Sequence, residues 1–117
     1  FDGPTNWVPL GTIVQARSGD KGGDANIGLW VGQGDKQAER AAWLREFMTV
    51  ERVRQLVPEA KGLDIEIFAL PNLCGVNVLI RRLLGDGVAA TTRFDPQAKG
   101  LGEWVRARKV DIPEELL

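Results

Sequence analysis

The 117-residue chain contains no histidine and no tyrosine, and Cys74 is its only cysteine. Without histidine the chain lacks the usual general base, the commonest metal ligand and any nucleophile system that depends on an imidazole. One cysteine cannot form a disulfide within the chain, which favours a reducing compartment, and we expect a cytoplasmic protein. Acid–base chemistry would depend on carboxylates and lysines. The sequence leaves an enzymatic role open, but it does not predict catalysis by this chain alone.

Long apolar runs and an excess of charge of one sign are also missing. Lysine and arginine number 15, aspartate and glutamate number 16, and the net charge is −1. Surfaces that bind nucleic acid normally carry a basic stripe with interleaved aromatic residues, and none is visible. The longest apolar run falls far short of the roughly 20 residues that a membrane helix needs. We therefore expect neither nucleic acid nor a membrane as a partner.

What is present is the composition of one ordinary domain, with 44% apolar and 26% charged residues. We expect an extended leader over residues 1–9 that docks through the indole of Trp7, a domain over residues 10–112 and a short tail over residues 113–117. No cofactor motif and no metal-ligand spacing is found, so no cofactor and no metal are expected.

Apolar residues that alternate with polar ones predict strands over residues 10–17, 26–32, 63–68 and 88–94. In the third of these strands, Ile65 and Ile67 lie on the buried face, and Glu66 and Phe68 lie on the wetter face. Residues 36–57 carry a helical pattern, either as one bent helix or as two short ones with Thr49 as the second N-cap. The nearly continuous apolar run over residues 74–84 is interpreted as a buried helix, and a last helix follows Pro96. The order β-β-α-β-α-β-α predicts an α+β fold: a two-layer, ferredoxin-like sandwich whose four-stranded sheet has helices on one face.

The segment from Ala16 to Ile27 is the part of the chain richest in polar residues and glycine. Gly19, Gly22 and Gly23 permit positive φ, and their amides are expected to point into one concavity that suits an anion. The segment matches neither a phosphate-binding P-loop nor a calcium loop. Two interpretations stay open: a loop that binds a ligand or partner, or a structural loop whose aspartates bind backbone amides.

Four further polar residues extend this candidate site. Asn77 lies in an apolar run, where an unpaired amide would cost about 1–3 kcal/mol, so we expect it to hydrogen-bond either the backbone or the loop. Asn72 is either a turn residue or a neighbour of the loop, and Asp95 and Lys99 either cap the last helix or join the same rim. The candidate ligand- or partner-binding residues are Arg17, Ser18, Gly19, Asp20, Lys21, Gly22, Asn26, Asn72, Asn77, Asp95 and Lys99.

Three stretches carry a family resemblance: Ala16 to Gly22, Ala25 to Gly28, and Leu70 to Leu73. They resemble the small carboxy-terminal domain of the acyclic terpene utilisation (AtuA-like) proteins, over about residues 10–112. The resemblance implies a ferredoxin-like fold and an accessory domain that follows a larger AtuA-like domain or accompanies it as a separate subunit. It also implies a place in the catabolism of acyclic terpenoids and branched acyl-CoA compounds, and it assigns no catalytic residue.

A second function remains open from the residues themselves. Arg17 and Lys21 would hold an anionic small molecule, such as an acyl-CoA, in a stand-alone binder or enzyme. Trp30, on the strand face opposite Ile27 and Leu29, is a candidate contact in a homo-oligomer.

Overall fold

The sheet that organises the molecule is built from two hairpins. A computed structural model describes residues 3–83 and 100–117. Strands β2 (Gln15–Lys21), β3 (Asp24–Trp30), β4 (Ile65–Leu70) and β5 (Gly75–Ile80) form a sheet in the order β2-β3-β5-β4, with every neighbouring pair antiparallel. Strands β3 and β4 therefore run parallel with β5 between them, which is the split β-α-β arrangement of ferredoxin-like sheets.

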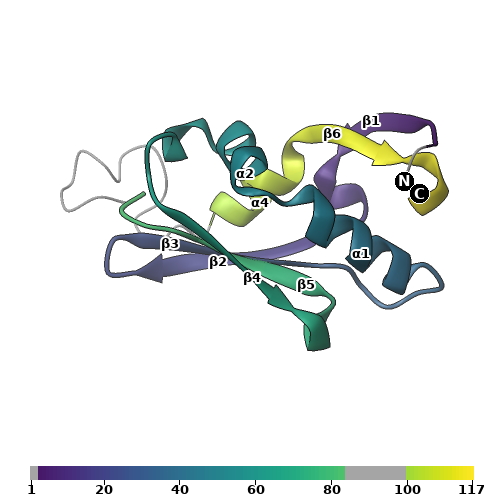
Figure 1. Cartoon of the computed structure of the whole chain (residues 1–117), viewed down its shortest axis with the longest axis horizontal. Coiled ribbons are helices and arrows are strands. Elements are labelled where there is room, and N and C mark those ends of the chain that lie inside the picture. Colours follow the sequence, from purple (N-terminus) through teal and green to yellow (C-terminus); the bar gives the residue numbers. More distant parts are fainter. Residues whose placement is uncertain (1–2, 84–99) are drawn as a thin grey trace.

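Three helices lie on one face of this sheet: α1 (Gln37–Phe47), α2 (Val50–Leu56) and α4 (Leu101–Ala107) (Figure 1). The predicted cap at Thr49 is confirmed, since its Oγ1 accepts a hydrogen bond from the backbone N–H of Arg52 at 3.1 Å. The helical pattern over residues 36–57 is thus two short helices. No helix in the described part of the chain is long and apolar enough to cross a membrane.

The core lies between the helices and the sheet. Ile27, Leu29, Val78 and Ile80 of the sheet are at most 2% exposed, and Leu44 of α1 is fully buried. Since helices cover one face of the sheet, the predicted α+β class and a four-stranded sheet with helices on one face are confirmed.

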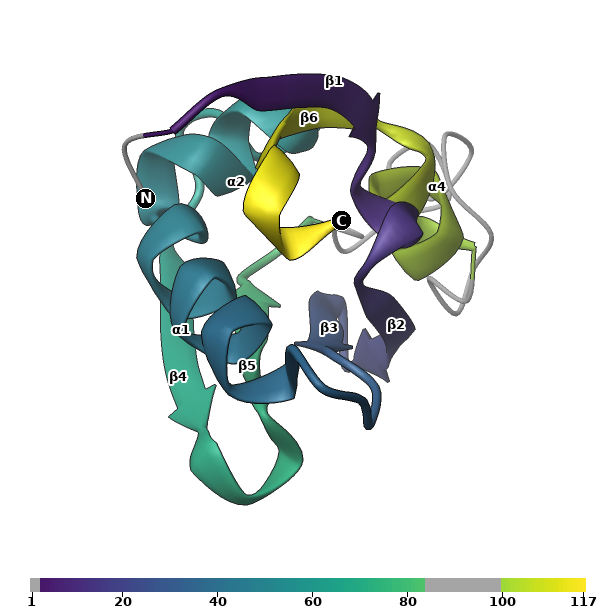
Figure 2. The same ribbon diagram turned by 90° about the vertical axis from the view of Figure 1, so that its right-hand side faces the viewer.

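The two ends of the described chain pair with each other in a separate ribbon. Strand β1 (Thr5–Pro9) runs antiparallel to β6 (Lys109–Pro113), and the two strands lie side by side in both views (Figure 1, Figure 2). After β6, the backbone N–H of Glu114 donates to the carbonyl of Pro4, and Leu116 is 2% exposed. The extended leader is thus a paired strand, and the expectation that it docks through the indole of Trp7 is wrong, because this side chain is 63% exposed.

The helix predicted over residues 74–84 is wrong. Residues Gly75–Ile80 form β5, a central strand with neighbours on both sides. A short apolar run fits a buried strand as well as a buried helix, and the β-branched residues Val76, Val78 and Ile80 favour the strand. The predicted element order is therefore corrected: along the chain, the fourth strand of this sheet is β5. The strand predicted over residues 88–94 lies outside the described residues.

Candidate functional site

The segment from Ala16 to Ile27 forms a regular β-hairpin. Lys21 pairs with Asp24, so Gly22 and Gly23 make a two-residue turn with φ values of 58° and 99°. Positive φ at both positions is typical of a type I′ turn. Gly19 lies within β2, in register with Asn26, and is not among the positive-φ glycines. The predicted concavity of three glycine amides is therefore wrong, because Gly19 lies in the paired part of β2 and only Gly22 and Gly23 lie in the turn.

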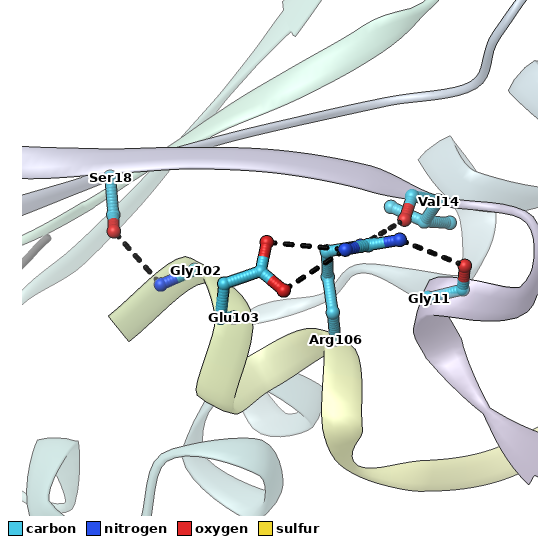
Figure 3. Close-up of polar contacts among 6 residues, drawn as sticks. All are labelled: Gly11, Val14, Ser18, Gly102, Glu103 and Arg106. Carbon is cyan, nitrogen blue, oxygen red and sulfur yellow. Dashed lines mark hydrogen bonds and ion pairs between the residues drawn. The ribbon is translucent and has the colours of Figure 1, made fainter. Parts of the chain in front are cut away.

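Strand alternation separates the candidate residues of β2 onto two faces. The side chain of Ser18 points toward the helices, where its hydroxyl accepts a hydrogen bond from the backbone N–H of Gly102 at 2.8 Å (Figure 3). A Cβ at Gly102 would lie 3.2 Å from that hydroxyl oxygen. Ser18 therefore joins β2 to the first turn of α4.

Arg106 fixes the other end of the same helix. Its Nε donates to the carbonyl of Val14 at 2.8 Å and its Nη2 to the carbonyl of Gly11 at 3.1 Å, while Nη1 pairs with Glu103 at 3.0 Å (Figure 3). These bonds hold the turn that leads from β1 into β2. Sequence reasoning missed this role, because Arg106 and its carbonyl partners lie more than 90 residues apart.

Asp24 supports the structural interpretation of the hairpin. Its Oδ1 accepts a hydrogen bond from the backbone N–H of Arg82 at 2.7 Å, and Oδ2 lies 3.8 Å from Nη1 of Arg81. Glu66 pairs with Arg81 at 2.7 Å, and this hydrogen bond, followed by the charge of Glu66, raises the pKa of the Arg81 guanidinium. The carboxylate of Asp24 thus ties the start of β3 to the end of β5.

The face of the four-stranded sheet that points away from the helices is not covered by any described element (Figure 1). We call it the open face and define it by three rows of paired residues. Each row contains one glycine, which leaves a position without a side chain. The rows are Gln15–Trp30–Gly75–Leu70, Arg17–Gly28–Asn77–Phe68 and Gly19–Asn26–Leu79–Glu66.

Two asparagines meet at the centre of the open face. Nδ2 of Asn77 donates a hydrogen bond to Oδ1 of Asn26 at 2.7 Å, from β5 to β3. The expectation that Asn77 is hydrogen-bonded is confirmed, and its partner belongs to the β2–β3 hairpin. Both side chains are half-buried. Within the described part of the chain, no further hydrogen bond is found for Asn26 Nδ2 or Asn77 Oδ1.

Apolar side chains surround this asparagine pair. Phe68 stands beside Asn77 and is 48% exposed, and the half-buried Trp30 and Leu79 complete the apolar part of the face. The prediction that Trp30 lies opposite Ile27 and Leu29 is confirmed. The side-chain alternation of β4 had already indicated that Phe68 lies on the wetter face, but not that it adjoins Asn77.

The remaining candidate residues that the structure describes are spread over both faces and both ends of the sheet. Arg17 is exposed on the open face, whereas Asp20 is exposed and belongs to the opposite face of β2. Gly22 lies in the hairpin turn, and Lys21 is in register with Asp24. Asn72 is exposed in the β4–β5 connection, at the end of the sheet away from that turn.

Two candidates, Asp95 and Lys99, fall outside the described residues, so their contacts stay a prediction. Cys74 lies in the turn before β5, with a φ of 53°, and packs against the core. Among residues 3–83 and 100–117, no three histidine, cysteine, aspartate or glutamate side chains form a group that could hold a metal ion.

Comparison with known families agrees with the split β-α-β sheet. Residues 8–111 match the model of the AtuA ferredoxin-like domain. The chain belongs to this family. No curated protein and no solved structure matches it significantly. The AtuA ferredoxin-like domain described here thus combines an open sheet face with a tightly braced β2–α4 contact.

Proposed function

We propose that this AtuA-like accessory domain docks through its open face onto the larger domain of an AtuA-like protein, in the same chain or as a separate subunit. The proposed setting is the catabolism of acyclic terpenoids and branched acyl-CoA compounds. The observation that carries the proposal is the uncovered sheet face with Phe68 48% exposed beside the Asn26–Asn77 pair.

The chemistry of the open face suits a folded protein partner. Aromatic residues are enriched at protein interfaces, and the open face supplies two of them, Phe68 and Trp30. At the centre, Asn77 Oδ1 can accept a hydrogen bond from a partner, and Asn26 Nδ2 can donate hydrogen bonds to one. An apolar area with a directional polar centre favours one orientation of docking.

The charges around this face also favour a mixed partner surface over a highly charged one. Arg17 and Arg81 are exposed on it, and Glu66 pairs with Arg81. Since both signs are present, we expect the docking affinity to depend weakly on salt.

The test is calorimetric titration of this domain with the larger AtuA-like domain, each prepared separately. Phe68→Glu is expected to weaken binding by about tenfold or more, because it places a charge in the apolar part of the interface. Leu73→Glu is the matched control: Leu73 is 63% exposed but lies in the β4–β5 connection, outside the open face. Circular dichroism melting confirms that both variants fold.

Equal affinity of the wild type and the folded Phe68→Glu variant would show that the open face is not the docking surface. A second outcome also contradicts the proposal. If the domain alone forms a dimer that Phe68→Glu dissociates, a second copy occupies the face, and the larger domain does not.

A further inference from the structure

A second surface feature lies on the helical side of the molecule, away from the open face. A groove of about 460 Å³ runs between α2 and the β1–β6 ribbon. Small-molecule sites commonly have volumes of about 300–1,000 Å³, so the groove has room for a metabolite. Its lining includes Trp7, Phe47, Arg52, Gln55, Arg108 and Lys109.

The groove concentrates positive charge in a chain whose net charge is −1. Three cations line it, Arg52, Arg108 and Lys109, against one carboxylate, Asp111. None of the ion pairs found among the described residues involves these three cations. An anion in the groove would therefore meet cations that are not already neutralised by a paired carboxylate.

Gln55 holds two of these cations in place. Arg52 Nη1 donates to Gln55 Oε1 at 3.1 Å, and Arg108 Nη2 donates to the backbone carbonyl of Gln55 at 3.3 Å. Each guanidinium also lies over an aromatic ring, Arg52 at 4.3 Å from the Phe47 centroid and Arg108 at 5.4 Å from that of Trp104. A guanidinium has five N–H donors, so both retain donors for oxyanion oxygens in a preorganised position.

The indole of Trp7 adds a planar apolar surface to the groove. It is 63% exposed and stands in β1 in register with Asp111. An exposed indole beside cations is the combination on which nucleobases stack while their phosphates are neutralised. An inorganic anion would contact only the cations and an apolar ligand only the indole ring, whereas a nucleotide would contact both.

We infer that this groove binds a nucleotide that carries at least two phosphates. The base stacks on Trp7, and Arg52, Arg108 and Lys109 bind the phosphate oxygens. The shared chemistry is that of a nucleoside diphosphate, either free or as the nucleotide end of a larger cofactor. This inference is separate from the docking role of the open face.

Isothermal titration of the intact chain with ADP tests the inference. We expect saturable binding, with adenosine and inorganic phosphate each at least about tenfold weaker, because each offers only half of the recognised chemistry. Coenzyme A distinguishes the two sources: an affinity well above that of ADP indicates the larger cofactor, and an equal affinity indicates the free nucleotide. Both results support the inference.

Variants locate the binding. Arg52→Gln, Arg108→Gln and Trp7→Ala are each expected to weaken ADP binding by about tenfold. Arg45→Gln removes an exposed arginine of α1 that does not line the groove, and it is expected to bind like the wild type. Thermal melting verifies that each variant is folded.

No binding of ADP or coenzyme A at millimolar concentration would overturn the inference, as would binding that none of the three groove variants weakens. Binding of an acidic peptide without binding of nucleotides would also overturn it. The Phe68→Glu variant separates the two proposals, because retained ADP binding with lost docking supports both sites independently. In the wild type, docking onto the larger domain without any nucleotide binding contradicts only the groove.

Discussion

The hydroxyl oxygen of Ser18 accepts a hydrogen bond from the backbone N–H of Gly102 at 2.8 Å, although 84 positions separate them. Ser18 stands in the most polar stretch of the sequence, but the bond places it on the helical side of the sheet. It therefore supports the attachment of α4 and does not belong to the open face.

Ser18→Ala is expected to lower the free energy of unfolding by about 1–3 kcal/mol, because the N–H of the buried Gly102 loses its acceptor. Urea unfolding followed by circular dichroism measures the change. Thr12→Ala, at an exposed position, serves as the control. An unchanged unfolding midpoint in Ser18→Ala would mean that α4 does not depend on this bond.

Gly75→Ala is expected to destabilise the sheet by about 3 kcal/mol or more, or to prevent folding. A Cβ at this position would lie 2.0 Å from the carbonyl oxygen of Leu29 and 2.8 Å from the Cα of Trp30, and neither backbone atom can move cheaply. Gly28→Ala is the matched control in the same sheet, since its Cβ would meet nothing closer than 3.7 Å. Soluble yield and melting temperature report both variants, and similar stability of the two would refute this close approach.

Arg106→Lys is expected to cost about 1–3 kcal/mol of stability although the charge is retained. One ammonium cannot replace the guanidinium that reaches the carbonyls of Val14 and Gly11 and the carboxylate of Glu103 together. Chemical denaturation provides the measurement. The conservative Arg45→Lys change, at an exposed position of α1, should leave the free energy of unfolding within about 0.5 kcal/mol of the wild type. An equal loss of stability in both variants would argue against a specific bracing role of Arg106.

The Asn26–Asn77 bond is expected to contribute a coupling energy of about 0.5–1.5 kcal/mol in a double-mutant cycle with Asn26→Ala and Asn77→Ala. The value is modest because both side chains are half-buried and water can replace the lost partner. Equilibrium unfolding of the wild type, the two single variants and the double variant completes the cycle. Strictly additive losses would show that the two amides do not stabilise each other.

Much of the local structure could be predicted from residue patterns. Period-2 alternation located β3 and β4 and correctly placed Trp30 and Phe68 on the face opposite the core. Thr49 marked the start of α2 because its side chain can bind a backbone N–H three residues later. The helical pattern over residues 36–57 fits either one bent helix or two short ones. The hydrogen bond of the Thr49 cap in the structure shows that there are two.

The errors share a physical cause. The prediction of a helix over residues 74–84 is wrong because a short apolar run has no period that distinguishes a helix from a central strand. Only the neighbours β3 and β4 reveal the strand. The glycines of the hairpin suggested an anion site, yet a type I′ turn and a flat strand face require glycine just as strongly. Residue type alone cannot separate these uses.

By itself, the sequence determined the class of fold, Thr49 as a candidate N-cap, the family and the absence of histidine chemistry. These depend on short-range periodicity, caps and composition. Only the tertiary structure decided that Ser18 meets Gly102, that Asn77 meets Asn26, and that Gln55 holds Arg52 and Arg108 beside Trp7. Strand register sets which side chains share a face, and helix packing sets which face stays open, so distant residues become neighbours only in the folded chain.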